Sequence, residues 1–138
     1  MTTNPLIGRT IKAIFIAEDK LAVKFELTDG DPIIARVDAD CCSYTWIEDL
    51  GDVSQILDSP VVSVENLSLR EDKETDDGAI RFYGCRITTR KGFTTIDYRN
   101  SSNGYYGGSL EWPSPNGNFY GGVHGQNISK EQWQQVMA

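Results

Sequence analysis

Apolar and polar residues alternate along the first third of the chain. From residue 21 to residue 27, apolar side chains occupy every second position, with Ala, Lys and Glu between them. A period of two is typical of a strand with one buried face. Apolar runs at 11–17 and 33–37 flank this strand, and an Asp-Gly pair at 29–30 is a hairpin signal. The pattern predicts an antiparallel meander over residues 11–37.

Helical spacing replaces the alternation at three places. Apolar residues from 44 to 50 are spaced as on a short helix, and Asp52 is a good cap for a second short helix over 53–57. Near the C-terminus, Ser129 and the Gln three residues later form a capping box. This box predicts a terminal helix over 129–137.

Four further strands are predicted, at 61–65, 80–89, 93–99 and 110–112. The charged run 71–78 lacks the alternating oxygen ligands of a calcium loop, so we interpret it as a solvated loop. Together with the meander, these elements predict a single α+β domain over residues 1–138. It is expected to be mainly an antiparallel β-sheet with short helices and a C-terminal helix.

Composition narrows the class of protein. Of 138 residues, 39% are hydrophobic and 24% charged, which argues against a disordered chain. No apolar run approaches the ~20 residues of a spanning helix, so no membrane partner is expected. Residues 1–5 carry no basic or apolar signal region, which predicts a cytoplasmic protein. The net charge of −7 argues against binding of duplex nucleic acid but leaves room for a small anion in a local site.

Residues suited to catalysis are sparse. The three cysteines, Cys41, Cys42 and Cys85, are expected to be reduced, with the adjacent pair buried at a structural corner. The single histidine, His124, has neither zinc-type spacing nor a nucleophile beside it, and there is no phosphate-binding or dinucleotide fingerprint. We therefore predict no catalytic residue, no metal and no cofactor, and an enzyme is the weaker class.

The stretch that follows the strand predicted at 93–99 has a different texture. It combines a guanidinium, two amides and two neighbouring rings with flexible glycines: Arg99, Asn100, Asn103, Tyr105 and Tyr106. This mixture is the chemistry of a polar, ring-stacking ligand site. It is equally the chemistry of a surface turn, and the residues alone leave both interpretations open.

Strand alternation predicts partners for this stretch. Phe82 and Arg86 share one face of their predicted strand, and Arg99 ends the next strand along the chain. If the two strands pair, one ring and two arginines could share a face, where arginine forks onto phosphate and the ring stacks on a base. The alternative is that Phe82 and Tyr98 belong to the core and that both arginines are simply solvated.

Three blocks carry a family resemblance. Asp-Cys-Cys at 40–42, Ile-Glu-Asp at 47–49 and Ser-Asn-Gly-Tyr-Tyr at 102–106 resemble, in order and spacing, a family of small phage and prophage proteins. The resemblance covers residues 6–112, and 113–138 is a turn-rich extension. The family is similar to the viral anti-Thoeris sponges, which sequester the cyclic ADP-ribose-type signal made by bacterial TIR proteins.

The resemblance implies a phage counter-defence protein that binds this nucleotide signal in the host bacterial cytoplasm, without catalysis and as a homo-oligomer; some sponges also hold cyclic oligonucleotides. It implies a ring that stacks on adenine and arginines that grip the pyrophosphate. The candidate positions are Phe82, Arg86, Tyr98 and Arg99, with Asn100 and Asn103 as polar readers. Two other functions stay open: a protein-interaction module that inhibits a host factor through an aromatic Gly-rich surface, and a nucleotide hydrolase.

Overall fold

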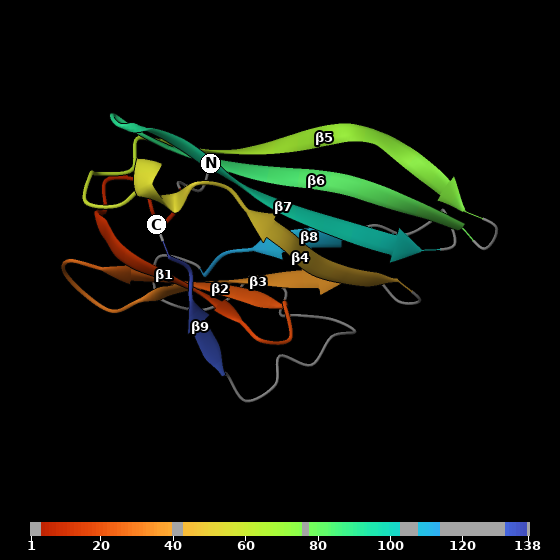
Figure 1. Cartoon of the computed structure of the whole chain (residues 1–138), viewed down its shortest axis with the longest axis horizontal. Helices are drawn as coiled ribbons and strands as arrows, with labels where there is room; N and C mark the ends of the chain where they lie inside the picture. The colour runs from red at the N-terminus through yellow and green to blue at the C-terminus, as the bar shows by residue number, and fades with distance from the viewer. Residues whose placement is uncertain (1–3, 40–42, 76–77, 103–107, 114–131, 138) are drawn as a thin grey trace.

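Two antiparallel β-sheets face each other in the computed structural model (Figure 1). The structure describes residues 4–39, 43–75, 78–102, 108–113 and 132–137. The lower sheet in Figure 1 has the strand order β8-β3-β2-β1-β9, and the upper sheet has the order β4-β7-β6-β5. No helix in these ranges is both long enough and apolar enough to cross a membrane.

The lower sheet is built on the predicted meander. β1, β2 and β3 are neighbours in that order and pair antiparallel, which confirms the interpretation of residues 11–37. β8 and β9 extend this sheet at its two edges. The strands are β1 (Ile11–Ala17), β2 (Ala22–Leu27), β3 (Ile33–Ala39), β8 (Gly108–Glu111) and β9 (Trp133–Gln135).

The upper sheet contains the longer strands. β6 and β7 form a hairpin around Arg90 and Lys91, and β4 and β5 flank this hairpin on either side. The strands are β4 (Tyr44–Leu50), β5 (Ser63–Thr75), β6 (Gly78–Thr89) and β7 (Gly92–Ser102).

The core fills the space between the two sheets. Because side chains alternate across a strand, each strand sends every second residue inward. The largest fully buried side chains include Phe25 and Ile14 from the lower sheet and Ile47, Ile87 and Ile96 from the upper one. A Leu or Ile removed from such a position typically costs about 2–5 kcal/mol.

The predicted helix at 44–50 is wrong, because this segment is strand β4. β4 pairs with β7 along its length, so backbone pairing with a long neighbour overrides the local spacing of apolar residues. The helix predicted at 53–57 is reduced to a short 3₁₀ turn at Val53–Gln55. Its cap is confirmed: the Ser54 N–H donates to Asp52 Oδ1 at 3.0 Å.

The predicted C-terminal helix is also wrong within the described part of the segment. Trp133–Gln135 forms β9, which pairs with β1, whereas residues 129–131 lie outside the described ranges. A capping box stabilises only one turn, and the unpaired edge of β1 satisfies the same backbone groups with strand bonds. The described fold is therefore all β apart from the short turn, rather than α+β.

The charged run at 71–78 is not the solvated loop that was predicted. β5 continues through it to Thr75, and Lys73 pairs with Ile80 and Glu74 with Ala79 on β6; residues 76–77 lie outside the described ranges. Exposed Lys and Glu on an edge strand are compatible with pairing on one side only. Pairing with the long strand β6 therefore makes this segment a strand, although its local charge suggested a loop.

Candidate functional site

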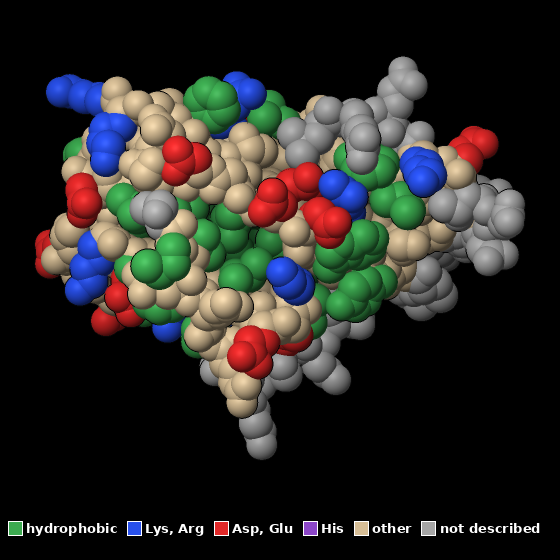
Figure 2. Space-filling model, viewed as in Figure 1, with side chains coloured by type: hydrophobic (Ala, Val, Ile, Leu, Met, Phe, Trp, Pro, Cys, Tyr) green, Lys and Arg blue, Asp and Glu red, His purple; other side chains and the backbone are tan. Residues whose placement is uncertain are grey.

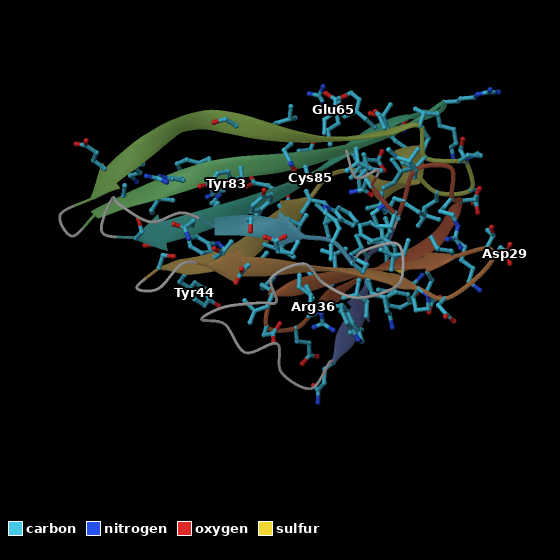
Figure 3. All side chains as sticks on the ribbon, turned by 180° about the vertical axis from the view of Figure 1, so that it is seen from behind. Asp29, Arg36, Tyr44, Glu65, Tyr83 and Cys85 are labelled. Carbon is cyan, nitrogen blue, oxygen red and sulfur yellow. The ribbon has the colours of Figure 1, made fainter. Side chains whose placement is uncertain are left out.

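The pairing of β6 with β7 places three of the predicted ligand-binding residues on one face. Phe82 lies opposite Arg99, and Arg86 lies opposite Thr95. The alternate residues of both strands point into the core, so these three point away from the lower sheet. Figure 3 shows the two sides of the upper sheet, with Cys85 facing the lower sheet and Glu65 on the opposite side.

Arg99 is held rigidly on this outer face. Its guanidinium carbon lies 4.9 Å from the centroid of the Phe82 ring. Its Nε and Nη2 donate to the two carboxylate oxygens of Asp97 at 3.3 and 3.2 Å, and its Nη1 lies 3.5 Å from Glu48 Oε1. The hydrogen bonds that Arg99 donates to Asp97, together with the charges of Asp97 and Glu48, raise the pKa of Arg99. The guanidinium edge is therefore engaged.

Two aromatic residues of β4 extend this arrangement. The rings of Tyr44 and Trp46 are stacked, with centroids 5.9 Å apart and planes 22° apart. Trp46 Nε1–H donates to Glu48 Oε2 at 3.0 Å, so Glu48 links the indole to Arg99. Tyr44 is 48% exposed, whereas Phe82 is only 6% exposed beneath its neighbours.

We call this set the aromatic–arginine surface: Tyr44, Trp46, Glu48, Phe82, Asp97 and Arg99. Figure 2 shows hydrophobic, acidic and basic side chains next to one another on the face of the molecule over β4 and β7. The surface offers flat rings, a fixed cation and carboxylate oxygens that accept hydrogen bonds. Such a combination can stack on a planar heterocycle and bind its amino or hydroxyl groups.

Arg86 forms a second and separate pair on the same face. Its guanidinium carbon lies 4.8 Å from the centroid of the Phe93 ring, which is 54% exposed. The Nε of Arg86 is buried and has no hydrogen-bond partner in the described part of the chain. Arg86 lies four positions after Phe82 along β6, which is roughly 13 Å at the rise per residue of a strand. The two pairs are thus neighbouring features rather than one cluster.

Tyr98 lies on the other side of the sheet, in the core. It is buried and stacks on Tyr83, with ring centroids 5.2 Å apart. Burial is the main reason that the pKa of the Tyr98 hydroxyl is raised. Figure 3 shows Tyr83 on the side of β6 that faces the lower sheet. The ring of Tyr98 is therefore a core ring, and a ligand on the outer face cannot stack on it.

Asn100 is also directed inward, and it joins strands instead of facing solvent. Its side-chain Nδ2 donates to Thr45 Oγ1 at 3.0 Å and to Ser43 Oγ at 3.2 Å. Thr45 Oγ1 donates its only proton to the Asp38 carbonyl at 2.9 Å, so it can only accept from Asn100, which fixes the amide orientation. The Oδ1 of Asn100 is buried without a partner among the described residues. We call Asn100, Thr45, Ser43 and the Asp38 carbonyl the polar bridge.

Several predicted residues fall outside the described part of the chain, namely Asn103, Tyr105, Tyr106, Cys41, Cys42 and His124. Cys85 is a free, buried thiol, and burial raises its pKa to about 12, so it carries no thiolate at neutral pH. Within the described ranges, His, Cys, Asp and Glu side chains form no group of three that could hold a metal ion.

Sequence reasoning missed the contribution of β4. Tyr44, Trp46 and Glu48 alternate with the buried Thr45 and Ile47, which is the pattern of a strand with an aromatic outer face. That signal was present in the sequence. It was hidden because Trp46 and Ile47, read with the next apolar residue, also fit the spacing of a short helix.

Comparisons with known proteins place the chain in a family. The family model described as a domain of unknown function (DUF7448) matches residues 4–112. An uncharacterized protein of Acanthamoeba polyphaga mimivirus is 32% identical over 107 residues, which cover 73% of this chain and 84% of the relative. No solved structure matches the chain.

Proposed function

The chain belongs to the DUF7448 family. We propose that it is a viral counter-defence protein that binds a cyclic ADP-ribose-type immune signal without degrading it, as the resemblance implies. The observation that carries the proposal is the aromatic–arginine surface, in which the Arg99 guanidinium lies over the Phe82 ring beside the stacked rings of Tyr44 and Trp46. Its rings and fixed guanidinium plane suit a planar base. The viral relative supports the viral context.

The geometry favours stacking over phosphate binding at Arg99. Asp97 and Glu48 occupy the guanidinium edge, and their charges would oppose a pyrophosphate there. Their free lone pairs can instead accept hydrogen bonds from an adenine amino group or a ribose hydroxyl. Arg86 lies opposite Glu65 on β5 but forms no ion pair within the described part of the chain, so we assign the phosphate-binding role to Arg86 rather than to Arg99.

Binding without catalysis fits the groups on this surface. Neither Asp97 nor Glu48 has a nucleophile or a histidine among its described contacts; each is paired with Arg99. The expected activity is therefore sequestration in the host cytoplasm, with the ligand released unchanged when the protein unfolds. As the resemblance implies, the working form is proposed to be a homo-oligomer.

Recovery of the ligand after denaturation tests the proposal. The protein is incubated with cyclic ADP-ribose isomers and, separately, with cyclic oligonucleotides, freed of unbound ligand by gel filtration, and heated. Mass spectrometry should then find an intact cyclic ADP-ribose isomer in the supernatant. A hydrolysed ligand would support the enzyme instead. Trp46→Ala should abolish the recovery, whereas Trp133→Ala, a matched change on the other sheet, should preserve it.

A protein-interaction module is the second candidate, and the exposed rings on the upper sheet favour it. Tyr44 and Phe93 are both about half exposed on a flat sheet face, and aromatic residues of this kind often anchor protein interfaces. This function predicts no ligand depletion in the same incubation with either class of nucleotide. That outcome would overturn the nucleotide proposal and leave the interaction module.

A further inference from the structure

The outer edge of β1 is occupied by the last residues of the chain. β9 pairs antiparallel with β1, with Phe15 opposite Gln135 and Ala17 opposite Trp133. The Val136 N–H donates to the Ile14 carbonyl at 2.8 Å, and the Glu18 N–H donates to the Gln132 carbonyl at 2.9 Å. β1 would otherwise present a row of unpaired backbone groups at the sheet edge. Figure 1 shows β9 beside the end of the lower sheet.

One side-chain contact adds to these backbone bonds. The Lys24 ammonium lies 4.7 Å from the centroid of the Phe15 ring and 5.0 Å from that of the Trp133 ring, so the cation sits between two aromatic faces. Gln134, Gln135 and Met137 are exposed. Val136, just after β9, packs against the core and Trp133 is half-buried, but a strand of only three residues is expected to open more readily than the longer strands.

The position of β9 in the sequence lets it reach another molecule. It lies outside the family domain at residues 4–112, and residues 114–131 separate it from the described end of that domain. A connection of that length spans up to about 60 Å when extended. The contacts of β9 with β1 are the same whether both strands come from one chain or from two, so exchange between copies costs no contact energy.

We propose that the edge of β1 is a strand-acceptor site and that the C-terminal strand of a second copy of this chain is its exchange partner. The recognised feature is an extended segment whose aromatic residue lies over Lys24. The balance between the closed and exchanged forms then depends on protein concentration relative to the effective concentration of the tethered strand. This inference does not depend on nucleotide binding.

A disulfide placed between the two strands tests the exchange. Phe15→Cys is introduced into one chain and Gln135→Cys into a second chain that differs in mass. These positions are direct partners, and opposite residues of an antiparallel pair lie about 4.5–5.5 Å apart, within reach of a disulfide. Because each chain carries half of the pair, the expected bridge joins two chains. After mild oxidation, its yield should rise roughly tenfold between 0.1 and 1 mM protein, in proportion to concentration.

Two controls make the result decisive. Gln134→Cys replaces Gln135→Cys in one mixture; its side chain points to the other face of the strand, so no bridge to Phe15→Cys is expected. This control also reports any background from the native cysteines. A single chain with both Phe15→Cys and Gln135→Cys should form the bridge internally. If that chain forms the bridge but the mixture of two chains forms none up to 1 mM, exchange between copies is refuted.

Discussion

Replacing Gly108 with alanine should break the polar bridge between the sheets. Gly108 is the first residue of β8 and lies against β4 and β7. A Cβ added there would overlap Thr45 Oγ1, and it would lie 2.9 Å from the Asp38 carbonyl oxygen and 3.0 Å from Asn100 Nδ2. Thr45 and Asn100 are both fully buried and hydrogen-bonded to each other, so neither can turn toward solvent. The strand must therefore shift or the bridge must open.

The size of the effect follows from what the methyl group displaces. Overpacking of a tight interior typically costs about 1–3 kcal/mol. Opening the bridge also leaves buried donors or acceptors of Thr45 and Asn100 without partners, at about 1–3 kcal/mol for each group. We therefore expect Gly108→Ala to lower the free energy of unfolding by about 3–5 kcal/mol. With a urea m-value of roughly 1.5–2 kcal/mol/M, the midpoint should fall by about 2 M.

Urea unfolding followed by tryptophan fluorescence measures this change. Gly51→Ala is the matched control, since a Cβ there meets the Thr95 nitrogen at 3.6 Å and Thr94 Cγ2 at 3.7 Å, both ordinary contacts. It should change the midpoint little. Adding Thr45→Ala to Gly108→Ala removes the clashing oxygen and should cost less than the sum of the single changes. Equal effects of Gly108→Ala and Gly51→Ala would refute the reasoning.

Three further predictions test other parts of the structure. Arg99→Ala should weaken binding of cyclic ADP-ribose by roughly 5- to 150-fold in calorimetric titration, because a lost stacking contact costs about 1–3 kcal/mol; unchanged affinity with a lower melting temperature would identify Arg99 as a structural strut only. Burial raises the pKa of the Cys85 thiol from its ordinary value of 9.0 to about 12, so the stability contributed by the protonated thiol is complete below pH 9 and is lost as the pH rises toward 12. Between pH 9 and 10 in reducing buffer, wild type should therefore lose stability more steeply than Cys85→Ala, by up to about 1.4 kcal/mol per pH unit. Parallel stability curves of the two proteins would contradict this. Asp52→Ala should lower the melting temperature, because the Asp52 carboxylate accepts hydrogen bonds from both Ser54 N–H and Ser54 Oγ–H. Asp52→Asn should keep most of the wild-type melting temperature, since its amide oxygen can still accept from Ser54 N–H. Equal losses in both variants would show that the cap geometry does not matter.

The meander and the β6–β7 hairpin could be predicted because their information is local. Alternating apolar residues and short turns determine both the strands and the faces that their side chains occupy. The hairpin pairs Phe82 with Arg99, and this register puts Phe82 and Arg86 on the face predicted for them. Pairing of strands that are adjacent in sequence therefore accounts for Phe82 and Arg99 in the aromatic–arginine surface, but not for the residues of β4.

The remaining strands depend on partners that are distant in sequence. β4 is a strand because it pairs with residues of β7 that lie 46 to 57 positions later in the chain, and β9 is a strand because the edge of β1 accepts it. The local spacing of apolar residues carries no information about a distant pairing strand, so both segments were interpreted as helices. The same limit applies to Asn100. Its polar character indicated a ligand contact, but its partners are Thr45 on β4 and Ser43 just before β4, more than fifty residues earlier in the chain.

The indole N–H signals of the three tryptophans test the central claim most directly. Trp46 lies in the aromatic–arginine surface, whereas Trp112 stacks on Phe25 and Trp133 lies beside Lys24 on the lower sheet. In a ¹⁵N-resolved NMR titration with cyclic ADP-ribose isomers, assigned by single Trp→Phe variants, the Trp46 signal should move with increasing ligand while the Trp112 and Trp133 signals stay in place. A ligand that shifts Trp112 or Trp133 and leaves Trp46 unchanged would contradict the placement of the binding site on this surface.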